Sequence, residues 1–320
     1  MLTDYWVIIQ LLAQICSLIL ITIALRFGII SIRFWNAKNA NEEQQITLER
    51  QDYLVSSIAK MVLSFQFLAL LMFLATVNLH FPNLIRGAMC ATGTLSANDF
   101  GYPLLFLKLF FVIFACIFSG IQNLDSSQPA YPLSPQKYVW LFPSFLFLLA
   151  DLVLMFAYFS NINPDLITTC CSLNFVTDSE NHFLDSGHFL KEILLLFAIS
   201  YIFLMIFALK KKPILQFFSG LIFVFSAIYT LKYFFVKYIY GLPSHFCLFD
   251  LFFANNFYVG YLFFGLYYLL LKTLINNILY HIFRKKLALD LPKTNVYVLV
   301  YATLIFLIPT FYWLFWKGDL

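Results

Sequence analysis

The chain alternates between long apolar runs and short polar connections. A helix needs about 20 apolar residues to cross the hydrocarbon core of a membrane, and each of these runs is about that length or longer. The predicted spans are residues 5–32, 59–79, 102–121, 138–159, 189–209, 214–236, 257–280 and 296–316. This pattern predicts an all-α, polytopic transmembrane helix bundle of about eight spans, with both termini on the same side of the membrane.

The first long connection, residues 34–58, is polar but contains no helix-breaking residue. No Pro or Gly occurs from Asn36 to Phe81, so one continuous helix is expected to include this connection and the second span. Its first part would lie at the membrane interface, and its second part would cross the membrane.

Positive side chains concentrate in one set of connections, residues 34–58, 122–137, 210–213 and 281–295. In or beside them lie Arg33, Lys38, Arg50, Lys60, Lys137, Lys210, Lys211, Lys212, Arg284, Lys285, Lys286 and Lys293. The opposite connections are residues 80–101, 160–188 and 237–256. In or beside them and at the C-terminus lie only Arg86, Lys191, Lys237 and Lys317. Because short cytoplasmic loops carry the excess of Lys and Arg, the first set is expected to be cytoplasmic. The second set and both termini would then face outward.

Composition supports the membrane class. The chain is 62% hydrophobic and 11% charged, whereas soluble domains have about 25% charged residues. No connection is long enough for a soluble catalytic domain, and no phosphate-binding Gly-rich motif is present, so residues 1–320 are expected to form a single integral membrane domain. The formal charge of +4 comes from Lys and Arg in the connections on one side of the membrane, so it does not indicate a nucleic-acid partner. The expected partners are the lipid bilayer and other membrane or periplasmic proteins.

Four of the six cysteines lie in the outward connections. They are Cys90, Cys170, Cys171 and Cys247. The other two, Cys16 and Cys116, lie inside apolar spans, where a thiol behaves as a small hydrophobic group. The sequence predicts that the outward sulfur atoms meet at one surface, with Met89 and His245 beside them.

Three kinds of chemistry fit these thiols. Two structural disulfides would join Cys170 and Cys171 to Cys90 and Cys247, because adjacent cysteines rarely bridge each other. A copper or zinc ion would suit the combined thiolate, thioether and imidazole ligands. A redox-active thiol pair is the third alternative. No C-x-x-C pair is present to decide among them.

Two histidines are candidate ligands for a different cofactor. His80 follows the second span and His188 precedes the fifth, so paired imidazoles could ligate a haem b near the outer surface. No C-x-x-C-H motif is present, which excludes covalent haem attachment through that motif. An ordinary role at the membrane interface is the alternative for both side chains.

Ionisable residues also occur inside the apolar spans. Lys108 and Asp151 lie at similar depths in the third and fourth spans, where one charge costs about 2.5 to 3.5 kcal/mol at a helix centre. An ion pair is therefore expected, with a role in proton or ion movement or extension of Lys108 toward the surface as alternatives. Gln10, Gln14 and Gln66 are expected to form hydrogen bonds between helices.

Several strings resemble those of a group of uncharacterised bacterial multi-span membrane proteins with outward MCxxGxL, TxCCS and HxCxxD motifs. These strings are MCATGTL at 89–95, DLITTCCS at 165–172, HFCLFD at 245–250 and YVGY at 258–261. The resemblance covers the second to the seventh span. It implies a multi-pass protein of the bacterial inner (plasma) membrane, whose outward cysteines belong to one site and face an oxidising compartment. It implies no activity.

These observations favour an accessory protein or subunit in redox or metal handling, with an extracytoplasmic cysteine-rich site. A transporter or permease component is the alternative, in which Lys108 and Asp151 lie in the membrane pathway and the cysteines form structural disulfides. A structural subunit of a membrane complex is a third alternative. No catalytic residue is identified, and whether the protein is an enzyme is left open.

Overall fold

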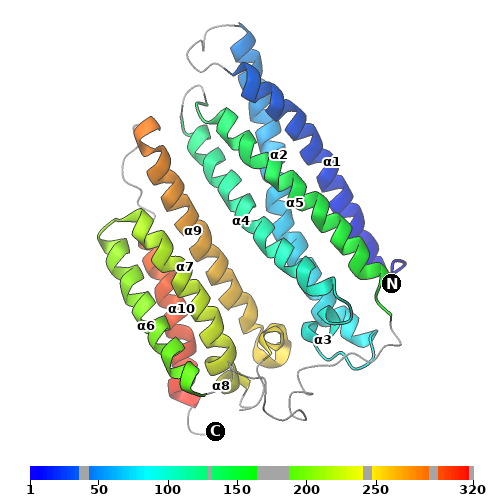
Figure 1. Ribbon diagram of the computed structural model, residues 1–320, viewed down its shortest axis with the longest axis vertical. Helices are drawn as coiled ribbons and strands as arrows, with labels where there is room; N and C mark the ends of the chain where they lie inside the picture. Colours follow the sequence, from blue (N-terminus) through cyan, green and yellow to red (C-terminus); the bar gives the residue numbers. More distant parts are fainter. Residues whose placement is uncertain (36–42, 129–130, 164–186, 241–246, 288–294, 317–320) are drawn as a thin grey trace. The chain divides into compact units, whose positions relative to one another are not determined.

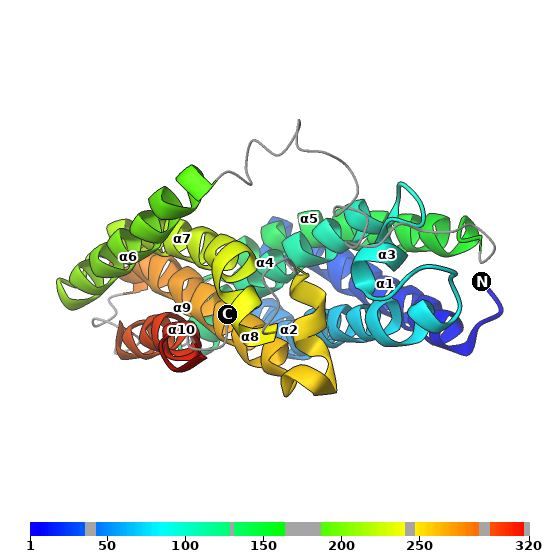
Figure 2. The ribbon, with the colours of Figure 1, turned by 90° about the horizontal axis from the view of Figure 1, so that it is seen from below.

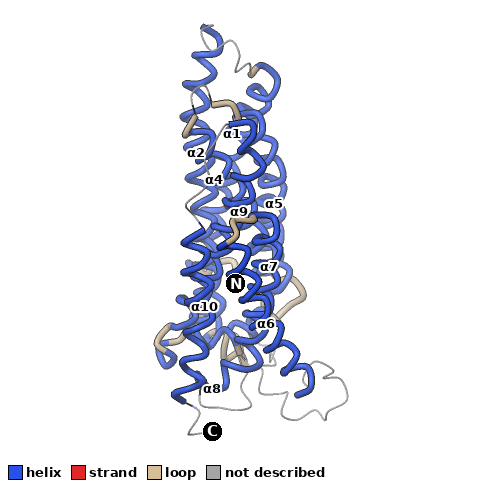
Figure 3. The backbone as a smooth tube through the Cα atoms, turned by 90° about the vertical axis from the view of Figure 1, so that its left-hand side faces the viewer, coloured by secondary structure: helices blue, strands red, loops and turns tan. Residues whose placement is uncertain are grey.

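The computed structural model describes residues 1–35, 43–128, 131–163, 187–240, 247–287 and 295–316. All regular secondary structure in these residues is helical, as Figure 3 shows. Eight of the described helices are long and apolar enough to cross a membrane. The predicted all-α bundle of eight spans is therefore confirmed, while the side that each terminus faces stays a prediction.

The chain divides into two compact units, residues 1–168 and 169–320. The blue to green helices in Figure 1 belong to unit 1, and the light green to red helices belong to unit 2.

Unit 1 contains four long helices arranged in a ring. They are α1 (Tyr5–Phe34), α2 (Glu43–Ala75), α4 (Gly101–Ser126) and α5 (Ser134–Ser160). Helix α1 packs against α2 and α5, and α4 packs against the same two helices, which closes the ring. The side chains of Ile21, Leu63, Phe118 and Leu141 fill its centre, while apolar residues such as Leu12 and Val153 are exposed on the outside. An apolar exterior is what a lipid environment requires.

The second span of unit 1 changes helical geometry near its end. Helix α2 continues without a break into the π-helical turn η1 (Thr76–His80) and the 3-10 turn η2 (Phe81–Asn83). The long helix expected from the lack of Pro and Gly is therefore present from Glu43 onward. A short helix, α3 (Ala91–Leu95), then precedes α4.

Unit 2 has the same kind of ring. Its long helices are α6 (Gly187–Leu209), α7 (Pro213–Thr230), α9 (Val259–Leu287) and α10 (Asn295–Trp316). Helix α7 continues into the π-helical turn η4 (Leu231–Phe235) and then into α8 (Val236–Tyr240). Two 3-10 turns, η5 (Leu248–Phe252) and η6 (Ala254–Asn256), precede α9. Helix α6 packs against α7 and α10, and α9 packs against the same two helices; Figure 2 shows these four helices from one end.

The two units repeat one order of elements. In each, the second span contains a five-residue π-helical turn near its end, and a cysteine then occupies the N-cap position of a five-residue helix: Cys90 precedes α3 and Cys247 precedes η5. The third span follows, and it begins at the dipeptide Gly-Tyr in unit 1 and close to the same dipeptide in unit 2.

The first residue of that dipeptide has the same packing role in both units. A Cβ atom on Gly101 would overlap the Leu95 carbonyl, and one on Gly260 would lie 3.0 Å from the Leu251 carbonyl carbon. Leu95 is in α3 and Leu251 is in η5, so the third span of each unit packs closely on the short helix that precedes it. The shared order and this shared contact indicate two copies of one four-span topology.

Candidate functional site in unit 1

A buried ion pair joins two spans of unit 1. Lys108, about two turns into α4, places its Nζ 2.8 Å from Oδ2 of Asp151 on α5. The two side chains are only 6% and 3% exposed. The pairing suggested by their similar depths is therefore present, and each charge has the counter-charge that burial in an apolar bundle demands.

A third helix contributes to the same centre. The Nε2 of Gln14, on α1, donates a hydrogen bond of 2.5 Å to Asp151 Oδ2. Both donors thus use one oxygen of the carboxylate, and Asp151 Oδ1 is buried with no hydrogen-bond partner among the described residues. A buried acceptor without a donor is uncommon and costs about 1–3 kcal/mol, so this oxygen is a place where a water molecule or a proton would be stabilised.

A small cavity adjoins the ion pair. Its volume is about 70 Å³, and Lys108 and Gln14 are among its lining residues. The other lining residues are Gln10 and Ala13 from α1, Phe65, Leu68, Ala69 and Met72 from α2, and Met155 from α5. This volume has room for a few water molecules, and Gln10, Gln14 and Lys108 are the polar side chains in an otherwise apolar wall.

The cavity is connected to the end of the second span through Gln10. The Gln10 Nε2 donates to Oγ1 of Thr76, the first residue of η1, at 2.7 Å, and also to the Trp6 carbonyl oxygen at 3.1 Å. Gln10 Oε1 and Gln66 Nε2 are buried without partners among the described residues. Gln10 and Gln14 therefore bond between helices as expected, whereas no such bond is described for Gln66.

His80 lies at the end of η1, beside the start of α1. Its Nε2 is 2.8 Å from Asp4 Oδ2, and its ring stacks on that of Trp6 with centroids 5.4 Å apart. The Asp4 side chain also caps α1 by accepting from the Trp6 N–H at 2.9 Å. Partial burial acts to raise the pKa of Asp4, but the hydrogen bonds from His80 and Trp6 outweigh it, so this pKa lies below its ordinary value. The haem pairing of His80 stays a prediction, because the side chain of His188 lies outside the described residues.

A second charged cluster lies at the other end of the same helices. Lys137 Nζ is 2.6 Å from Oδ2 of Asp52 and 2.9 Å from Oδ2 of Asp125, and all three side chains are fully buried. Ser134 Oγ donates to Asp52 Oδ1 and the Leu133 N–H donates to Asp125 Oδ1. Every carboxylate oxygen therefore has a donor, which is the pattern of a structural link between α2, α4 and α5.

Of the four outward cysteines, the structure describes Cys90 and Cys247. No disulfide joins any of the cysteines that the structure describes. Met89 is exposed, and Cys247 Sγ lies within 4.8 Å of a carboxylate oxygen of Asp250 in unit 2. Cys170, Cys171 and His245 lie outside the described residues, so the convergence of the outward thiols stays a prediction.

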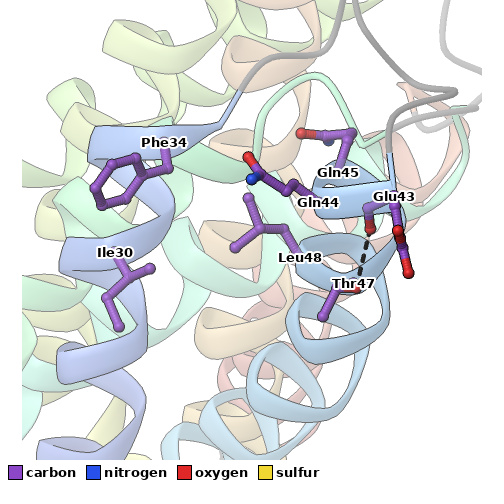
Figure 4. Close-up of a pocket in the computed structure, with 7 residues that line it drawn as sticks. All are labelled: Ile30, Phe34, Glu43, Gln44, Gln45, Thr47 and Leu48. Atoms are coloured by element: carbon purple, nitrogen blue, oxygen red, sulfur yellow. Dashed lines mark hydrogen bonds between the residues drawn. The ribbon is translucent and has the colours of Figure 1, made fainter.

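The hollow shown in Figure 4 lies between the end of α1 and the start of α2. Its volume is about 480 Å³, and it is lined by Ile30, Phe34, Glu43, Gln44, Gln45, Thr47 and Leu48. Thr47 Oγ1 donates a hydrogen bond to the Glu43 carbonyl oxygen within α2. The described lining contains no pair of opposite charges, so the Lys108–Asp151 centre is the better candidate.

The chain was compared with known proteins, and no family model, curated protein or solved structure matches it.

Proposed function

We propose that this integral membrane protein is a component of a proton-coupled transporter, with the Lys108–Asp151 pair in its membrane pathway. The observation that carries this proposal is the buried pair itself, with one carboxylate oxygen lacking a donor and a water-sized cavity beside it. A buried ion pair rarely adds stability compared with well-packed apolar residues. Ionisable residues inside a membrane bundle are therefore more often kept for function.

The repeated topology supports the same class. Many secondary transporters consist of two structural repeats, in parallel or inverted topology. Aligning Gly101 with Gly260 places the buried Tyr267 at the position of Lys108. The buried polar residues described in unit 2 are all uncharged; one contact among them joins Ser200 Oγ and Ser226 Oγ at 3.2 Å. The charged centre therefore belongs to the first copy, as expected if the two copies have diverged in role.

The geometry suggests how a proton would act. A proton on Asp151 Oδ1 would neutralise the carboxylate without displacing either donor from Oδ2. The Lys108 ammonium would then be buried without a counter-charge, which is unfavourable. Protonation would thus weaken the link between α4 and α5, and a change in their packing would couple proton uptake to movement of a solute.

Proton flux provides the direct test. Liposomes that contain the purified protein and an internal pH-sensitive dye should acidify under an imposed potassium diffusion potential. The rate with Asp151→Asn is expected to fall about tenfold or more, because the proton acceptor is lost. Ser144→Ala, which alters a buried hydroxyl on the same helix, is the matched control and should retain the flux. Equal rates for wild type and Asp151→Asn would refute the proposal.

A second candidate function, in redox or metal handling, rests on unit 2. The approach of Cys247 Sγ to the Asp250 carboxylate supplies two adjacent ligands suited to zinc. The outward cysteines, Met89 and His245 would complete the site, and the protein would then serve as an accessory or subunit. We expect purified protein to bind zinc in elemental analysis and Cys247→Ser to lose it. Thiol counts that rise on reduction, in protein without metal, would instead show disulfides.

A further inference from the structure

The geometry points to a proton-access route from His80 to the Lys108–Asp151 centre, formed by one face of α1 and the π-helical turn η1. This inference deepens the proposed function and rests on it. It concerns how a proton reaches Asp151 from the end of the bundle at which α1 begins.

The route follows a regular spacing on α1. Trp6, Gln10 and Gln14 are each four residues apart, so they share one face of the helix. Successive members are about 6 Å apart along the helix axis at 1.5 Å per residue. Trp6 contacts His80, Gln10 contacts Thr76, and Gln14 contacts Asp151. One ring contact and two hydrogen bonds therefore lead stepwise from the start of α1 to the buried carboxylate.

The other side of the route is formed by η1. Thr76 and His80 are the first and last residues of this turn, and they make the two shallower contacts with α1. A π-helical turn inside a longer helix often marks a functional site. Here it allows both a hydroxyl and an imidazole of the second span to contact α1.

Unpartnered polar atoms lie along this route. Trp6 Nε1, Gln10 Oε1 and Asp151 Oδ1 are all buried and have no hydrogen-bond partner among the described residues. Buried polar atoms of this kind are usually satisfied by ordered water. The cavity that Gln10, Gln14 and Lys108 line has room for such water. Water molecules there would extend the side-chain contacts into a hydrogen-bonded chain.

His80 is suited to pass protons into this chain. Its side chain is 19% exposed, so it can exchange protons with solvent. The Asp4 carboxylate, whose pKa is lowered, can only accept at this contact, so Nε2 of His80 donates and Nδ1 is the accepting nitrogen of that tautomer. The groups that face the ring are Asp4, Tyr5, Trp6 and Phe81, and those that face Asp151 are Lys108 and Gln14.

The proton balance is simple. A solvent proton binds His80 Nδ1, the imidazolium releases one proton to the adjoining water, and that chain delivers one proton to Asp151 Oδ1. His80 returns to its neutral form. No bond other than those to the transferred proton changes, and no other reactant is required.

The test compares His80→Gln with a matched histidine substitution in the liposome assay. His80→Gln is expected to slow proton flux about tenfold or more, since general acid–base groups contribute at least that much. His281→Gln, at an exposed position on α9, should leave the rate unchanged. Gln10→Leu should also slow the flux, because it removes the middle contact of the route.

Imidazole added to the buffer separates a relay from a structural role. It should restore most of the flux of His80→Gln, because a small base can replace the missing ring, whereas a folding defect would not respond. Unchanged flux in His80→Gln, or slow flux that imidazole does not restore, would overturn the route. If Asp151→Asn slows the flux and His80→Gln does not, only the route fails. If Asp151→Asn itself has no effect, the proposed function fails.

Discussion

Asp151→Asn is expected to lower the free energy of unfolding by about 3–5 kcal/mol, the usual cost of removing one partner of a buried ion pair. The Asn side chain keeps an oxygen that can accept from Gln14, so the hydrogen bond of 2.5 Å has a replacement. Lys108, whose side chain is 6% exposed, would lose its counter-charge. Thermal unfolding of the purified protein in detergent would show this loss as a lower Tm.

The double variant Lys108→Met/Asp151→Asn separates stability from function. Removing both charges should recover most of the Tm, because no uncompensated charge remains and methionine fills a similar volume. Proton flux should stay as low as in Asp151→Asn. Ser144→Ala, a substitution at a buried position on α5 without charge, should change neither measurement much. A double variant that transports like the wild type would show that the pair is only a structural link.

The fold was largely predictable because membrane insertion depends on a local property of the chain. A run of apolar residues must form a helix in lipid, since every backbone polar group has to be satisfied internally. The eight spans follow from that rule and agree with the structure. The Lys108–Asp151 pair could be predicted for a related reason, because charges buried at similar depths in consecutive spans have few other partners.

The rest of the centre depends on packing that the sequence does not display. Gln14 reaches Asp151 only because α1 packs beside α5, although their spans are not consecutive. The i, i+4 spacing of Trp6, Gln10 and Gln14 was a usable signal for a polar face. The change to π-helical geometry at Thr76 had no comparable signal, because no Gly or Pro occurs within the turn itself, Thr76–His80.

The repeat of the two units was also hidden in the sequence. The short Gly-Tyr dipeptides at Gly101 and Gly260 are too common to suggest duplication. They become informative only when the structure shows each glycine against the backbone of the preceding short helix. Likewise, Lys137 was assigned to topology alone, and the acidic residues Asp52 and Asp125 were not predicted to meet it, since the three come from different helices.

Lys137→Met is expected to be at least as destabilising as any loss at the Lys108 centre. It would leave two fully buried carboxylates without a cation, so a loss of at least about 3–5 kcal/mol is expected. The Tm and the yield of monodisperse protein would both fall. Lys60→Met is the matched control: Lys60 donates to Asn123 Oδ1 in an exposed contact, and surface contacts of this kind are worth about 1 kcal/mol or less.

Removing all three charges completes the comparison of the two clusters. The triple variant Lys137→Met/Asp52→Asn/Asp125→Asn should recover part of the Tm, because its buried groups are neutral and the Ser134 and Leu133 donors keep acceptors. Its proton flux should match the wild type, since every carboxylate oxygen in this cluster already has a donor and none is open to a proton. Loss of flux in a stable triple variant would mean that the Lys137 cluster, too, belongs to the pathway. Retained flux here, together with lost flux in Lys108→Met/Asp151→Asn, would show that the unpartnered Asp151 oxygen distinguishes the functional charges from the structural ones.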